Sequence, residues 1–93
     1  MNKEEAENCL REIAKYGYIQ PSRHCRKRMQ ERHISMDDVL YVLLWGSVTD
    51  IEYNKNHDSW QCNVKGKDIE GESLVFVAGI HEYCQAVRCI TVY

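Results

Sequence analysis

The first part of the chain has apolar residues at helical spacing. Between residues 4 and 17 they stand three or four positions apart, and charged residues occupy the positions between them. This period is typical of an amphipathic helix with one buried face. Gly17 predicts the end of that helix, and residues 18–21 then read as a short connector. The apolar positions are Ala6, Cys9, Leu10, Ile13 and Ala14.

A second helix is predicted to begin near Ser22, whose hydroxyl can cap it. Its apolar stripe is thin, with only Cys25 and Met29 four residues apart.

A third helix has the clearest start signal in the sequence. Ser35 and Asp38 have the spacing of a capping box, with Asp in place of the usual Glu or Gln. Ile34 and Val39 stand where a hydrophobic staple would hold the entry of the helix. Gly46 predicts its end.

After residue 46 the period changes from helical spacing to alternation. Strands are predicted over residues 48–53, 60–65, 74–80 and 86–93, and the nearly all-apolar run 74–80 should be central in the sheet. Short connections favour an antiparallel meander, and helices grouped before strands favour an α+β fold. We therefore expect one domain over residues 1–93, with N-terminal helices packed on one face of a C-terminal antiparallel sheet of about four strands.

Composition places the chain among ordinary globular domains, with 44% hydrophobic and 28% charged residues. The start is polar and acidic, unlike a signal peptide, and no apolar run has the ~20 residues of a membrane span. The five cysteines are odd in number and lack C-x-x-C spacing, which favours a reducing compartment. These features predict a cytoplasmic protein with no membrane contact.

The cysteines allow three interpretations. Cys84 and Cys89 could join His81 in a zinc site, or Cys84, Cys89 and Cys62 could pair oxidatively. Buried thiols that act as apolar filler are the favoured account.

The formal net charge of −2 conceals a basic segment. Residues 22–33 contain five Lys or Arg against Glu31 alone. His24, Arg28 and Arg32 follow one another at four-residue spacing, so they share one face of the predicted helix. Like charges stacked in this way need a compensating acidic group or an anionic ligand.

A family resemblance rests on this segment. Ser22, His24, Cys25, Arg28, Met29, Arg32, Ile34 and Ser35 resemble the opening motif of the small prokaryotic proteins grouped as domain of unknown function 4258. The turn between Gly66 and Gly71, the apolar strand after it and the final residues 90–93 are similar as well. The resemblance covers residues 22–93. His33 replaces the usual glycine between two helices, and this position is expected to need positive φ.

At fold level the family resembles the RelE-like, BrnT-like and MqsR-like toxins of bacterial toxin–antitoxin pairs. The resemblance implies a metal-independent RNA endonuclease without a cofactor, partnered by RNA and by an antitoxin-like protein. Such chemistry needs proton-transfer groups and cations that hold phosphate. Here the candidates for proton transfer are His24, His81 and Tyr93, and the candidate cations are Arg28, Arg32 and Arg88.

Two other interpretations compete with the enzyme. The arginines could be structural, bridging helix to sheet through Asp50, Glu52 or Glu82. Alternatively, the chain could be a non-catalytic interaction module whose basic helix docks an acidic partner or a second copy in a homodimer. The acidic total charge weakens the RNA hypothesis, because RNA-binding proteins are generally basic.

Overall fold

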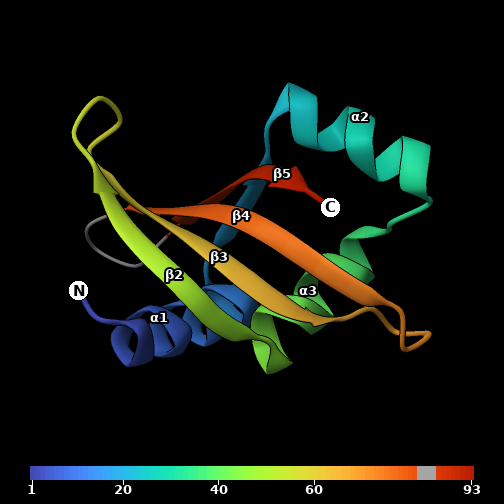
Figure 1. Ribbon diagram of the computed structural model, residues 1–93, viewed down its shortest axis with the longest axis horizontal. Helices are drawn as coiled ribbons and strands as arrows, with labels where there is room; N and C mark the ends of the chain where they lie inside the picture. Colours follow the sequence, from blue (N-terminus) through green and yellow to red (C-terminus); the bar gives the residue numbers. More distant parts are fainter. Residues whose placement is uncertain (82–85) are drawn as a thin grey trace.

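A computed structural model describes residues 1–81 and 86–93, and within them the chain forms three helices and five strands (Figure 1). The helices are α1 (Lys3–Tyr16), α2 (Arg23–Arg32) and α3 (Met36–Trp45). The strands are β1 (Tyr18–Pro21), β2 (Ser47–Asn54), β3 (Ser59–Lys67), β4 (Ser73–His81) and β5 (Ala86–Val92). The predicted α+β class is confirmed.

The strands form one sheet in the order β1-β5-β4-β3-β2. The meander from β2 to β5 is antiparallel, and β4 is central, as the apolar run at 74–80 predicts. The sheet has five strands where the sequence predicts about four, because residues 18–21, a predicted connector, form β1. This strand pairs in parallel with β5, from Tyr18 opposite Ala86 to Pro21 opposite Cys89. Four residues are too few to show alternation, and Pro21 is tolerated because β1 lies at the sheet edge.

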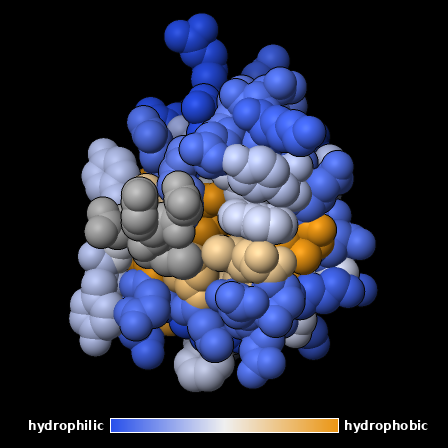
Figure 2. Space-filling model, turned by 90° about the vertical axis from the view of Figure 1, so that its left-hand side faces the viewer, coloured by the Kyte–Doolittle hydropathy of each residue, from blue (hydrophilic) through white to orange (hydrophobic). Residues whose placement is uncertain are grey.

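The hydrophobic core lies between one face of the sheet and helices α1 and α3, which are below the sheet in Figure 1. Phe76 and Ile80 of β4 are fully buried there against Leu10 and Ile13 of α1 and Leu43 of α3. At the end of the molecule shown in Figure 2, hydrophobic residues form a band with hydrophilic residues above and below it. None of the helices in the described residues has the length and apolar character to cross a membrane.

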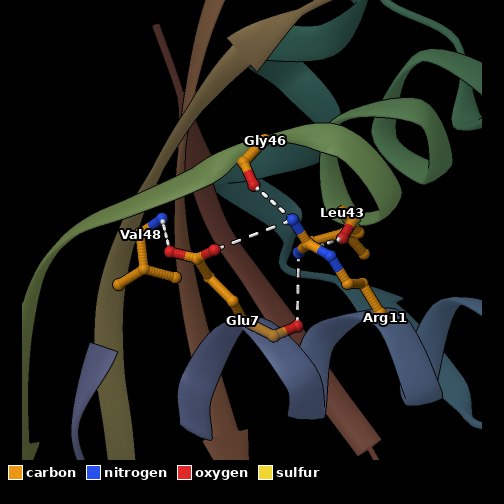
Figure 3. A network of polar contacts seen from close by, with 5 residues as sticks. All are labelled: Glu7, Arg11, Leu43, Gly46 and Val48. Atoms are coloured by element: carbon orange, nitrogen blue, oxygen red, sulfur yellow. Dashed lines mark hydrogen bonds and ion pairs between the residues drawn. The ribbon is translucent and has the colours of Figure 1, made fainter. Parts of the chain in front are cut away.

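Helix α1 is fastened to the domain by a polar network (Figure 3). Arg11 donates from Nη1 to the carbonyl oxygen of Leu43 (3.4 Å) and from Nη2 to that of Gly46 (3.0 Å). The guanidinium lies 3.7 Å from the Glu7 carboxylate, which accepts a hydrogen bond from the Val48 N–H at 3.2 Å. Arg11 thus places a cation at the C-terminal end of α3, whose own last turn has none.

Helix α2 lies along the outer edge of β5, in the part that β1 leaves unpaired. The Ser22 N–H donates to the Cys89 carbonyl oxygen at 2.8 Å, and Arg28 Nε donates to that of Val92 at 3.4 Å. The buried thiols of Cys25 and Cys89 form a hydrogen bond across the same junction, which lowers the pKa of Cys25. The helix therefore covers a strand edge that would otherwise expose free carbonyl groups.

The connection from α2 to α3 confirms the predicted positive φ at His33, which has φ 56° and ψ 44°. The N–H groups of His33 and Ile34 donate to the carbonyl oxygens of Gln30 and Met29, which is a Schellman motif. The capping box of Ser35 and Asp38 is present as predicted. These local bonds set the angle at which α2 leaves the sheet edge.

Candidate functional site

The sheet face opposite α1 and α3 carries polar side chains. Alternation along the strands turns Gln61 of β3, His81 of β4 and Arg88 of β5 away from the core. The strand register places Gly79 between Gln61 and Arg88, because it pairs with both of them. In Figure 1, α2 and the β2–β3 turn rise above this face at its two sides.

A cavity of about 480 Å³ occupies the space between these walls, and we call it the open-face cleft. Six of the eight described elements and the β2–β3 turn contribute to it. None of the lining residues within 1–81 and 86–93 is acidic. They are Gln20, Ser22, His24, Asn54, His57, Ser59, Gln61, Gly79, His81, Arg88 and Ile90.

Ser22 sets the position of the wall that α2 provides. Its Oγ accepts a hydrogen bond from the Cys25 N–H at 3.0 Å and donates one to the Ile90 carbonyl oxygen at 2.9 Å. The same hydroxyl therefore caps the helix and ties its first turn to β5. This double role holds His24, two residues into α2, at the mouth of the cleft.

The opposite wall is the β2–β3 turn, which carries His57. Asn54 Oδ1 accepts hydrogen bonds from the N–H groups of Asn56 (3.0 Å) and His57 (3.4 Å), so the Asn54 side chain stabilises the turn. Asp58 has a positive φ of 47°, and its carboxylate hydrogen-bonds the Tyr53 hydroxyl. Local polar bonds thus direct His57 to the cleft.

Gly79 leaves room on the floor of the cleft. A Cβ at this position would stand 3.6 Å from both Ile90 Cδ1 and Ser59 Oγ, which is ordinary contact. A side chain here would extend into the cleft, so glycine keeps it open beside Arg88.

The structure brings together three of the six predicted site residues. His24, His81 and Arg88 line the open-face cleft. Arg28 is held at the β5 edge by its bond to the Val92 carbonyl, and neither Arg32 nor Tyr93 is among the residues that line the cleft.

Sequence reasoning missed the contributions of His57 and Gln61. The sequence predicts a strand over residues 60–65 that includes Gln61, and His57 falls in the connection before it. No local signal marks them, because their role comes from the registers that bring β3 and its turn beside β4.

In the described residues, the arginines form none of the suggested ion pairs with Asp50 or Glu52. Within residues 1–81 and 86–93 the only ion pair is that of Arg11 with Glu7. Arg88 is exposed on the open face, so it meets the expectation that it points outward. Glu82, the third suggested partner, lies outside the described residues.

The zinc hypothesis meets a geometric obstacle. Cys89 is fully buried on the core face, whereas His81 belongs to the open face, so the two cannot share a metal ion. The described residues contain no group of three or more His, Cys, Asp or Glu side chains that could hold one. Cys84 lies outside them. Cys25, Cys62 and Cys89 are free buried thiols, as expected of apolar filler.

Comparison with known proteins places the motif residues in a family. The sequence profile described as "Domain of unknown function (DUF4258)" matches residues 22–93. The chain belongs to this family. The profile begins at Ser22, the residue that anchors α2 to β5, and it includes every lining residue of the cleft except Gln20. No curated protein and no solved structure matches the chain.

Membership of DUF4258 does not cover α1 and β1, which precede the matched residues. Both are nonetheless integrated with the family domain, α1 through the Arg11 network and β1 through its pairing with β5. The resemblance to RelE-like toxins stays a prediction, because family membership carries no assigned activity.

Proposed function

We propose that this member of DUF4258 is a metal-independent RNA endonuclease whose site is the open-face cleft. The observation that carries the proposal is the gathering of three of the chain's four histidines, His24, His57 and His81, around one cavity with Arg88. They come from three segments far apart in sequence, so no local pattern accounts for their convergence.

The chemistry follows from these residue types. A neutral imidazole removes the proton of the ribose 2′-hydroxyl, and the oxygen then attacks the adjacent phosphorus. The bond from phosphorus to the 5′-oxygen breaks, and a protonated imidazole donates its proton to that leaving oxygen. The products are a 2′,3′-cyclic phosphate and a 5′-hydroxyl. The Arg88 guanidinium stabilises the extra negative charge on the phosphoryl oxygens in the transition state.

The placement of the histidines suits an in-line displacement, in which the attacking and leaving oxygens lie on opposite sides of phosphorus. His24 comes from the β5 side of the sheet and His57 from the β2–β3 side, with His81 and Arg88 of the central strands between them. We therefore propose His24 and His57 as the pair that moves protons.

The local charge of the cleft differs from the acidic net charge of the whole chain, which by itself disfavours RNA binding. Among the described residues, the cleft is lined by one arginine, three histidines and no carboxylate. A phosphodiester that enters the cleft therefore meets mainly cationic and neutral side chains in the part of the chain that the structure describes, although the net charge of the chain is negative.

The test is incubation of the purified protein with a labelled oligoribonucleotide in chelator, followed by analysis of the product ends. Wild type is expected to produce 2′,3′-cyclic phosphate ends and to leave a 2′-deoxy substrate intact. His24→Ala, His57→Ala and Arg88→Gln should each lose at least about a hundredfold in rate, the usual contribution of one acid–base or oxyanion group.

The matched control is His33→Asn, because His33 is the one histidine outside the cleft and asparagine tolerates its left-handed backbone. Its rate should equal that of wild type. Cleavage that survives all three cleft variants would contradict the assignment. Absence of cleavage by folded wild type, on free or ribosome-bound RNA, would favour the alternative of an interaction module that docks a partner through α2.

A further inference from the structure

A second cavity adjoins the open-face cleft and shares Arg88 with it. It measures about 270 Å³ and is lined by Gln20, Pro21, Ser22, Arg23, Arg26 and Arg88. Three of these residues, Gln20, Ser22 and Arg88, also line the cleft. We call this second cavity the arginine pocket.

The arginine pocket concentrates positive charge without compensation. Half of the described residues that line it are arginines, and none of them is acidic. In the described part of the chain, Arg23, Arg26 and Arg88 form no ion pair. Three guanidinium groups around a small cavity repel one another, and the arrangement becomes favourable when an anion occupies it.

The position of two of these arginines strengthens the inference. Arg23 is the first residue of α2 and Arg26 follows one turn later, at the end of the helix where cations are disfavoured by the macrodipole. The first turn contains no acidic residue. A sequence selected for helix stability alone would place carboxylates here. The arginines therefore stand where they cost stability, a pattern that is typical of binding sites.

The backbone offers further donors at the same place. The Cys25 N–H donates to Ser22 Oγ and the Arg26 N–H to the Ser22 carbonyl oxygen. Among the described residues, the hydrogen bonds leave the N–H groups of Arg23 and His24 without an acceptor. They supplement the side-chain cations as donors to an anion at the start of α2.

We propose that the arginine pocket binds the phosphate next to the scissile one along the same RNA strand. The inference rests on the proposed function and adds to it a substrate class. Because Arg88 borders both cavities, one strand can place consecutive phosphates in the cleft and in the pocket. The enzyme then selects oligoribonucleotides with consecutive phosphates over substrates with a single phosphate.

The first experiment measures anion binding without any cleavage. Inorganic phosphate is titrated into the protein while the arginine Nε–H signals are followed by NMR. The Arg23→Gln, Arg26→Gln double variant is expected to bind phosphate about tenfold or more weakly, since it loses charge-assisted hydrogen bonds. The control Lys27→Gln removes an exposed cation of the same helix that lines neither cavity, and it should leave binding unchanged within about twofold. Equal binding by wild type and the double variant, or equal weakening by the control, overturns the pocket.

The second experiment separates the pocket from the activity. Cleavage of a dinucleoside monophosphate is compared with that of the same dinucleotide bearing an added 5′- or 3′-phosphate. Wild type should gain about tenfold in kcat/KM from one of the added phosphates, and the double variant should gain nothing. Cleavage without such a gain overturns the pocket while the ribonuclease stands. If no substrate is cleaved, the proposed function fails, and the phosphate titration alone decides whether the pocket binds an anion.

Discussion

Gly79 offers a way to test the cleft without touching a charged or proton-transferring group. The Cβ of Gly79→Ala would stand 3.6 Å from Ile90 Cδ1 and from Ser59 Oγ, and 3.9 Å from the Arg88 carbonyl oxygen. No atom must move, so the backbone entropy of glycine decides the outcome. We expect Gly79→Ala to be more stable than wild type by roughly 0.5–1 kcal/mol.

A larger side chain at the same position should block the site. In Gly79→Leu the added carbons extend beyond the Cβ into the cleft, beside Arg88. We expect the unfolding free energy to stay within about 1 kcal/mol of wild type, since the side chain enters open space. RNA cleavage should fall by at least about tenfold, because the substrate loses its place against the floor of the cleft.

Gly46→Ala is the matched comparison on the opposite side of the sheet. A Cβ on Gly46 would meet the carbonyl oxygens of Val42 at 2.6 Å and Lys65 at 3.0 Å, and Val64 Cγ1 at 3.1 Å. Two of the three are backbone atoms that cannot turn away. We expect a loss of about 1–3 kcal/mol in stability, with the activity of the folded fraction retained.

The assays are urea unfolding followed by circular dichroism and cleavage of a labelled oligoribonucleotide under native conditions. If Gly79→Leu is folded and cleaves RNA at the wild-type rate, the open-face cleft is not the active site. If Gly79→Ala is strongly destabilised, the geometry described for the floor of the cleft is wrong.

Three further predictions concern the scaffold. Arg11→Met should lower the free energy of unfolding, measured in urea, by roughly 1–2 kcal/mol, because the partly exposed guanidinium loses its bonds to α3. The control Lys15→Met, on the same helix, should lower it by less than about 0.5 kcal/mol. A hydrogen bond from the Ser35 N–H lowers the pKa of Asp38. The stability that Asp38 provides should therefore be complete above its unfolded value of about 4 and be lost as pH falls through the lower folded value. Unfolding of wild type and Asp38→Asn compared across pH tests this, and a difference in stability that does not shrink in acid would contradict it. Burial raises the pKa of the Cys62 thiol to about 12, so native protein at pH 8 should resist alkylation at Cys62 until urea unfolds it, as mass spectrometry would show.

The helices illustrate what local sequence controls. The Ser35–Asp38 capping box, the Ser22 cap and the positive φ of His33 were all predictable, because each depends on bonds between residues a few positions apart. The four longer strands were predictable for a similar reason, since alternation of apolar and polar residues reports one buried face. Only β1 was missed, because it forms through a parallel pairing with β5, almost seventy residues later in the chain.

The candidate site was likewise predictable from the sequence only in part. The sequence alone indicated the DUF4258 motif and marked His24, His81 and Arg88 as candidate site residues. It could not show that Arg28 is held at the β5 edge, or that His57 joins the cleft in place of Tyr93. The strand order and the antiparallel registers decide which side chains share the open face, and these depend on pairings between distant residues. Tertiary structure therefore decided the composition of the site, because side chains meet by register and packing and not by their spacing along the chain.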